Sequence, residues 1–241
     1  MKEKIYTIPI TESYEQDSEC PFCFIEKTLE NDAVEYALGA AMMEPDYRVI
    51  SNDKGYCNKH FSMMLSHPNK LSLALVLETH IAELTKKLEN INPAPETKKK
   101  GIFSKQETPS CEEIKELSGS CVICDKIEET LKRYTEVFFY MWEKDDAFKE
   151  KVLSSKGFCM KHYARLAEAA YSNLKHPEEF TLPVHKLQLE NLKRIYDDVH
   201  KFTLKFDYRN KDMEWGTAQD APKRSTEKLR GYTIPVKEER K

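Results

Sequence analysis

The sequence predicts an all-α protein: two duplicated three-helix repeats that bind metal through Cys and His and pack together, with irregular or extended termini. Three observations predict this fold. The 241 residues include only 7 glycines, about 3%, which is under half the usual share. Apolar residues recur at three- and four-residue intervals through much of the chain. Six of the 7 cysteines fall into two matching patterns.

The two patterns have nearly the same spacing, C-x2-C-x33-C-x2-H and C-x2-C-x34-C-x2-H. The first copy contains Cys20, Cys23, Gly55, Cys57, Lys59 and His60, and the second contains Cys121, Cys124, Gly157, Cys159, Lys161 and His162. The segment 25–29 (IEKTL) also resembles 127–131 (IEETL). Matching segments at one offset indicate a duplicated unit. We therefore expect a first repeat over residues 1–90 and a second over residues 112–205.

Each repeat is expected to contain three helices. The first helix follows the cysteine pair, where Ile25, Leu29 and Ala33 recur with helical spacing, as do Ile127 and Leu131 in the second copy. Shorter helices follow the third cysteine, at roughly 58–66 and 160–175. A long helix follows each His-Pro dipeptide.

The segments outside the repeats are expected to be irregular. Residues 91–111 form a flexible linker rich in Pro, Lys, Ser and Thr, with a solvated lysine run at 98–100 and a free thiol at Cys111. The similar pentapeptides 6–10 (YTIPI) and 232–236 (YTIPV) are expected to be extended, because proline confines such segments to edges or irregular positions.

Three thiolates and one imidazole suit a tetrahedral Zn²⁺ ion. The predicted ligands are Cys20, Cys23, Cys57, His60, Cys121, Cys124, Cys159 and His162, which would bind two zinc ions per chain. In Cys-x-x-His the two ligands lie on one helix face. Gly55 and Gly157 can adopt the positive φ that leads into that helix. Lys59 and Lys161 are placed to offset the negative charge of three thiolates from the second shell of each site.

Four protein ligands leave no open coordination position, which is typical of a structural site. Closure of each site within one repeat is the simpler arrangement. The alternative is that the cysteine pair of one repeat meets the Cys-x-x-His of the other. An iron–sulfur cluster is the alternative cofactor, and a thiol redox role is suggested by Cys20-Pro-Phe-Cys23. The other histidines lack ligand spacing and are expected to be cap, surface or core residues: His67, His80, His176, His185 and His200.

The C-terminal segment, residues 206–241, has no counterpart in the first repeat. We expect it to pack back on the helices with Trp215 as its anchor. The alternative is a recognition surface, because Arg and Trp dominate interface hot spots. Its candidate residues are Tyr208, Arg209, Trp215 and Arg224.

The duplicated CxxC…GxCxKH motif and the terminal FDYRN…WG segment together resemble an uncharacterised bacterial family known only as a domain of unknown function. The resemblance covers nearly the whole chain. Some members carry an automatic label as ABC-transporter substrate-binding proteins. We expect no such role, because the sequence shows no export signal, no lipobox cysteine near its start and no alternating α/β pattern. The resemblance implies no activity, substrate or catalytic residue.

The composition narrows the function. A net charge of −3 gives no general attraction to nucleic acid or anionic membranes. No segment approaches the ~20 apolar residues that span a bilayer. No phosphate loop, G-x-S-x-G or H-E-x-x-H motif is present, so an enzyme is not favoured. We expect a zinc-binding cytoplasmic protein that acts as an interaction or scaffold module for an unknown protein partner. Nucleic-acid binding is possible but not favoured, and no membrane partner is expected.

Overall fold

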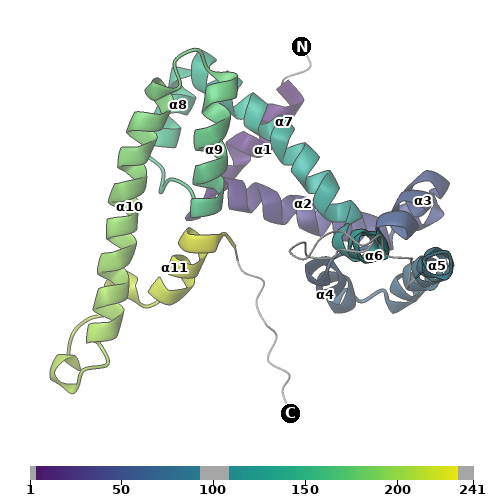
Figure 1. The fold of residues 1–241 in the computed structure, drawn as a ribbon. Helices are drawn as coiled ribbons and strands as arrows, with labels where there is room; N and C mark the ends of the chain where they lie inside the picture. The colour runs from purple at the N-terminus through teal and green to yellow at the C-terminus, as the bar shows by residue number, and fades with distance from the viewer. Residues whose placement is uncertain (1–3, 93–108, 233–241) are drawn as a thin grey trace, which may run out of the picture. The chain divides into compact units, whose positions relative to one another are not determined.

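The computed structural model describes residues 4–92 and 109–232, and all regular secondary structure in this part of the chain is helical (Figure 1). These residues form eleven α-helices and three short 3-10 helices, with no strand among them. The all-α prediction is therefore confirmed.

Both repeats contain the three expected helices and one short helix more. The first repeat consists of α2 (Pro21–Leu38), α3 (Pro45–Lys54), α4 (Asn58–Ser66) and α5 (Lys70–Glu89). The second consists of α7 (Val122–Lys144), α8 (Asp146–Leu153), α9 (Met160–Asn173) and α10 (Glu178–Leu204). The additional helices are α3 and α8, which precede the glycine of each motif.

The chain divides into two compact units that do not coincide with the two repeats. Unit 1 comprises Met1–Thr28 and Thr130–Lys241, and unit 2 comprises Leu29–Glu129. The boundaries fall inside α2 and inside α7. Each unit therefore contains part of both repeats.

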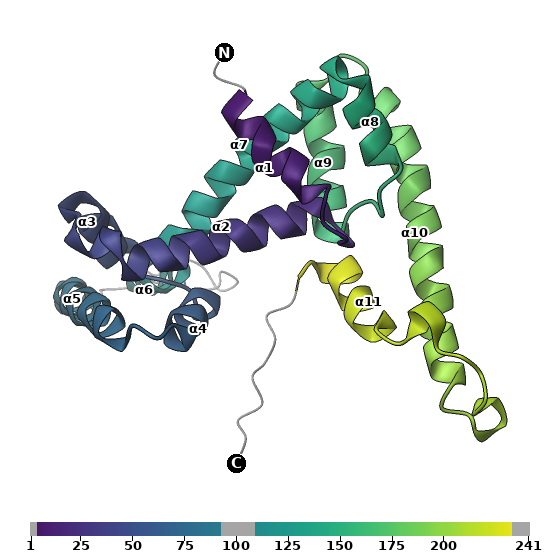
Figure 2. The ribbon, with the colours of Figure 1, turned by 180° about the vertical axis from the view of Figure 1, so that it is seen from behind.

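Unit 1 has a core of aromatic side chains. Helix α10 packs against α8, α9 and α11 (Ala221–Arg230), and Figure 2 shows the same arrangement from behind. Phe138 lies at the centre of the core, with ring centroids 5.5 Å from Phe22, 5.6 Å from Phe148 and 5.8 Å from Phe180. Edge-to-face pairs of this kind stabilise a core beyond the burial of their area.

The N-terminal pentapeptide is helical, and the expectation that residues 6–10 are extended is wrong. Helix α1 (Lys4–Ser13) contains Pro9 in its interior. Interior proline removes one helical hydrogen bond and costs roughly 3 kcal/mol. The helix is held by tertiary contacts of unit 1 instead, because Ile10 is fully buried and Tyr14 packs against Phe148 at 5.5 Å. Of the matching C-terminal segment, residues 233–236 lie outside the described part.

Unit 2 is built on α5. Helices α3 and α4 both pack against α5, and the short 3-10 helix η1 (Ala40–Met43) contacts α3. Helix α6 (Pro109–Gly119) leads into the second cysteine pair. Most of the expected linker, residues 93–108 with the lysine run, lies outside the described residues. Cys111 belongs to the first turn of α6, and its side chain also lies outside them.

No helix of the described residues has both the length and the apolar character needed to cross a membrane.

Candidate metal centres

Centre 1, in unit 1, consists of Cys20, Cys23, Cys159 and His162, and all four side chains are buried. The Nδ1 atom of His162 lies 3.4 Å from the sulfurs of Cys20 and Cys23 and 3.3 Å from that of Cys159. The Cys23 and Cys159 sulfurs are 3.4 Å apart. A tetrahedral zinc ion, with bonds of about 2.3 Å to sulfur and about 2.0 Å to nitrogen, would place such atoms about 3.5–3.8 Å apart. The four ligand atoms therefore suit one ion.

Centre 2, in unit 2, consists of Cys57, His60, Cys121 and Cys124. Here the Nδ1 atom of His60 lies 3.2, 3.3 and 3.5 Å from the sulfurs of Cys57, Cys121 and Cys124. The Cys57 and Cys124 sulfurs are 3.7 Å apart. In each centre, all four ligand atoms lie within 4.8 Å of one another, so each group could hold a metal ion. The sulfurs are too far apart for disulfides, which need about 2.05 Å.

The ligand pairing is exchanged between the repeats, and the expectation that each repeat closes its own site is wrong. The cysteine pair of the first repeat meets Cys159 and His162 of the second, and the pair of the second repeat meets Cys57 and His60 of the first. The physical reason lies in the packing of unit 1. Phe22, between the first two cysteines, packs against Phe158 at 6.1 Å and against His162 at 5.6 Å, and all three belong to one core.

The local sequence builds the Cys-x-x-His half of each centre in the same way. Cys57 is the N-cap residue of α4 and Cys159 is that of α9, so each thiol lies at the positive end of a helix dipole. The Cys159 sulfur also accepts a hydrogen bond from the backbone N–H of His162. Gly55 and Gly157 have φ angles of 65° and 73°, as the sequence predicts. A methyl group on Gly55 would lie 2.6 Å from the His80 ring, so this position requires glycine.

Each histidine turns its second ring nitrogen toward a buried glutamate. His162 Nε2 lies 3.5 Å from a carboxylate oxygen of Glu26, and His60 Nε2 lies 3.6 Å from one of Glu30. These separations are just beyond a hydrogen bond, and both nitrogens are buried without another partner. A carboxylate facing the outer nitrogen fixes the tautomer of a metal-binding histidine, which leaves Nδ1 free to bind the ion. The motifs alone do not point to either glutamate, because both lie in α2, outside the Cys and His spacing.

The two motif lysines contact these glutamates. Lys161 pairs with Glu26, and Lys59 pairs with Glu30. The lysines thus pair with the carboxylates behind the histidines and not with the sulfurs themselves. In each centre, the histidine therefore faces a glutamate, and that glutamate pairs with the motif lysine.

The two halves of each centre are joined by different polar contacts. In unit 2, the Val122 N–H donates to Gly55 O at 3.1 Å, and the Ser120 hydroxyl donates to Lys54 O at 2.7 Å. In unit 1, the fully buried ammonium of Lys228 in α11 donates to the carbonyls of Glu19 and Lys156. By the repeat offset, Lys156 corresponds to Lys54 and Glu19 to Ser120. A lysine from the unduplicated C-terminal segment therefore replaces a serine hydroxyl.

Burial and contacts within each centre oppose one another in setting the pKa values. Burial raises the pKa of the Cys20 thiol to about 12. At Cys121, burial raises the pKa, but the hydrogen bond with His60 and backbone hydrogen bonds lower it to about 6. Burial lowers the pKa of His60, while its contacts with Cys121 and Glu30 raise it to about 9. Because metal ligands must be deprotonated, a metal ion would release protons from both centres.

The other histidines all lie outside the two centres. His67 caps α4, His80 contacts Asn52 O at 2.9 Å, and His185 bonds the Tyr163 hydroxyl at 2.8 Å. His176 lies 3.3 Å from a carboxylate oxygen of Glu178, and His200 stacks on Tyr196. Within the described residues, none of them joins a metal-binding group.

Of the four candidate recognition residues, two serve internal contacts. Trp215 packs against Phe202 at 5.4 Å and is half-buried. Arg224 lies in a network with Glu19, Asp198 and Asp220. Tyr208 is exposed, and Arg209 pairs with its neighbour Asp207 at the surface. Of these four residues, Trp215 and Arg224 thus make contacts within unit 1, whereas Tyr208 and Arg209 face outward.

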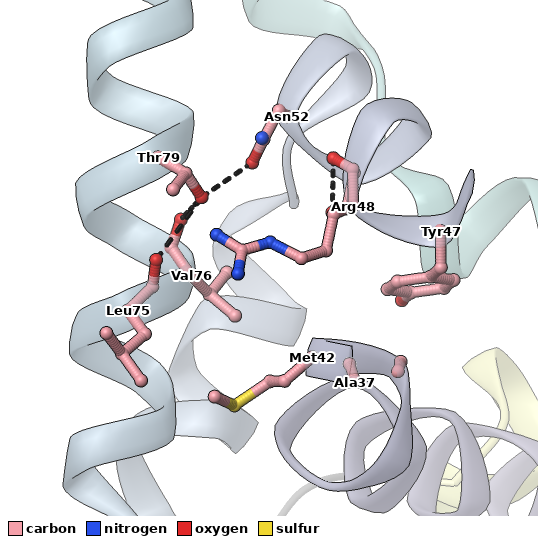
Figure 3. A pocket seen from close by; sticks show the side chains of 10 residues that line it. Ala37, Met42, Tyr47, Arg48, Asn52, Leu75, Val76 and Thr79 are labelled. Atoms are coloured by element: carbon pink, nitrogen blue, oxygen red, sulfur yellow. Dashed lines mark hydrogen bonds between the residues drawn. The ribbon is translucent and has the colours of Figure 1, made fainter. Parts of the chain in front are cut away.

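A small pocket in unit 2 lies apart from centre 2 (Figure 3). Ala37, Met42, Leu75 and Val76 give it apolar walls, and the Arg48 side chain reaches across it toward α5. Thr79 closes one side by a 2.9 Å hydrogen bond to Asn52. Among the described residues, no acidic side chain pairs with Arg48.

Comparison with known proteins identifies the family. A search of curated proteins and a search of solved structures each found no match. One family model matches residues 1–235, which is nearly the whole chain. That model describes a family of unknown function, in agreement with the resemblance noted from the motifs. The chain belongs to the family of unknown function designated DUF6062.

Proposed function

We propose that the chain is a zinc protein in which two structural Cys₃His centres each join a cysteine pair of one repeat to the Cys-x-x-His of the other. The observation that carries the proposal is the convergence of four ligand atoms within 4.8 Å, twice, from segments far apart in sequence. Four protein ligands of soft sulfur and imidazole nitrogen favour zinc, and they leave no position for a substrate.

The spacing of the ligand atoms favours a single ion over an iron–sulfur cluster. In a [4Fe–4S] cluster each ligand binds a different iron, so the ligand atoms must stand further apart than around one ion. The sulfur separations of 3.4 and 3.7 Å fit the single ion. A thiol redox role for the Cys20 and Cys23 pair is less favoured, because Cys159 and His162 surround the same sulfurs.

The test is metal analysis of the full chain purified without chelator, combined with an absorption spectrum. We expect about two zinc ions per chain and no visible absorption band. Iron with sulfide would support the cluster instead, and a chain free of metal would overturn the proposal.

The biological role that we propose is that of an interaction module for a protein partner. Large apolar side chains are exposed on η1 and α3 of unit 2, at Met43, Val49 and Ile50. The same segment carries Arg48, which is half-buried at the pocket and pairs with no acidic side chain of the described residues. Apolar and arginine side chains together are typical of interface centres.

A matched pair of variants tests this role. Val49→Glu places a charge on the proposed surface, while Leu65→Glu does so at an exposed apolar residue of α4. A protein that binds wild type and Leu65→Glu but not Val49→Glu, at unchanged zinc content, supports the role. If the partner protein binds all three chains equally, this surface is not its binding site.

Nucleic-acid binding is the other candidate role, and the net charge of −3 weighs against it. An electrophoretic shift assay at several salt concentrations distinguishes it, because phosphate contacts weaken steeply as salt rises.

A further inference from the structure

The two centres have the same ligands but differ in their exposure to solvent. All four ligands of centre 1 are buried. In centre 2, His60 and Cys121 are buried, but Cys57 is half-buried and Cys124 is exposed. One centre is thus buried throughout, whereas two of the three cysteines of the other are not fully buried.

The C-terminal segment accounts for the sealing of centre 1. A methyl group on Gly231 would lie 3.4 Å from the Cys23 sulfur and 3.8 Å from the Cys159 sulfur, so the backbone after α11 lies against both. Lys228 anchors this segment from within. Among the described residues, no helix after α5 corresponds to α11, and Cys124 of unit 2 is exposed.

We propose that Cys57 and Cys124 form a peroxide-sensitive thiol pair, and that oxidation opens centre 2 while centre 1 stays intact. This inference rests on the proposed zinc function. The two sulfurs are 3.7 Å apart, so about 1.7 Å of approach would bring them to the length of a disulfide. A cysteine that binds zinc is deprotonated, and reactive cysteines are thiolates that solvent can reach. Cys124 is the most exposed ligand of the eight.

The reaction proceeds in two steps with hydrogen peroxide as the oxidant. The Cys124 thiolate attacks one peroxide oxygen, the O–O bond breaks, hydroxide leaves, and Cys124 becomes a sulfenic acid. The Cys57 thiolate then attacks that sulfur, an S–S bond forms, the S–O bond breaks, and a second hydroxide leaves. The two hydroxides take up two protons from solvent. The two thiolates lose two electrons, and peroxide is reduced to water.

The disulfide would leave only Cys121 and His60 as ligands of centre 2. Two ligands do not hold a structural ion, so the metal of this centre is released. Centre 1 is the internal control, because its Cys23 and Cys159 sulfurs are even closer, at 3.4 Å, but buried. If the distance between sulfurs alone decided, the disulfide would form first in centre 1. If exposure to solvent decides, it forms first in centre 2.

The experiment is a peroxide titration of the zinc-loaded full chain, with zinc release followed by a coloured chelator and disulfides mapped by mass spectrometry without reduction. We expect about one of two zinc ions to leave, together with a cross-linked peptide pair containing Cys57 and Cys124. Cys20, Cys23 and Cys159 should remain reduced. Release of both ions at one rate, or a Cys23–Cys159 linkage that forms first, would overturn the inference.

A ligand-preserving variant sharpens the test. Cys124→His keeps a metal donor but removes the exposed thiol, so we expect zinc retention and no peroxide-induced release. Should this variant fail to load centre 2, the peptide map of the wild-type chain still decides. A wild-type chain that holds no zinc before peroxide treatment would overturn the proposed function. The disulfide map would then still show whether Cys57 and Cys124 are oxidised before the buried cysteines of centre 1.

Discussion

The exchange of ligands between the repeats predicts which pairs of substitutions remove one zinc ion and which remove two. Cys23 and Cys159 belong to different repeats but to one centre, where their sulfurs are 3.4 Å apart. Cys23 and Cys57 belong to one repeat but to different centres. We therefore expect the Cys23→Ser/Cys159→Ser chain to keep about one zinc ion and the Cys23→Ser/Cys57→Ser chain to keep none.

The stability effects follow the same pattern. Apparent binding free energies of structural zinc are about 10–16 kcal/mol, comparable to the entire stability of a domain. The first substitution in a centre forfeits most of that energy, so a second one in the same centre adds little. Substitutions in different centres should be close to additive. Cys23→Ser/Cys159→Ser should thus unfold near the denaturant midpoint of Cys23→Ser alone.

The assay is zinc content per chain after gel filtration, with urea unfolding followed by helical circular dichroism. Both single variants should hold about one ion. The reasoning is refuted if Cys23→Ser/Cys159→Ser loses both ions while Cys23→Ser/Cys57→Ser keeps one, because that result requires each repeat to close its own centre.

Three further predictions concern residues around the ligands. Glu26→Gln and Glu30→Gln should each weaken zinc binding at one centre by about 10–100-fold, because each carboxylate faces a histidine Nε2. The measurement is chelator competition, and unchanged zinc affinity would exclude this role of the carboxylates. Gly55→Ala should destabilise the chain by more than about 1 kcal/mol in urea unfolding, through its positive φ and the His80 contact, whereas Gly119→Ala, with open space around it, should not. Lys228→Met should lower the free energy of unfolding by about 1–3 kcal/mol in urea unfolding, because it leaves two backbone carbonyls unpaired. Lys223→Met, at an exposed position of the same helix, is the control and should have little effect.

The ligand residues and the helices around them could be predicted because the spacing is local. Cys-x-x-Cys and Cys-x-x-His place their side chains together whatever the rest of the chain does, and positive φ at Gly55 and Gly157 follows from the same motif. Helices α4 and α9 begin directly after their N-cap cysteines, so the histidine three residues later lies in the first turn, beside the cysteine.

The pairing and the outer contacts could not be predicted from spacing. Both possible pairings use the same eight side chains, so the motif cannot distinguish them. Glu26 and Glu30 are two among many helical glutamates, and only the tertiary structure turns them toward His162 and His60. Lys228 resembles any surface lysine in sequence, because lysine is almost never fully buried. Helix α1 was missed because local propensity at Pro9 was outweighed by burial of Ile10.

Loop entropy does not explain the exchange, so specific contacts must select it. Closure within a repeat would join Cys23 to Cys57 and Cys124 to Cys159, across 34 and 35 residues. The observed closures are nested: the inner one spans 67 residues, and once it is formed the outer loop contains about 70. Each loop is thus about one doubling longer, which costs about 0.6 kcal/mol, or about 1.2 kcal/mol together. One buried aromatic pair contributes about 0.5–1.5 kcal/mol beyond its area, and one hydrogen bond contributes a similar amount. Phe22 against Phe158 in unit 1, with the Val122 and Ser120 hydrogen bonds in unit 2, is therefore sufficient to favour the exchanged arrangement.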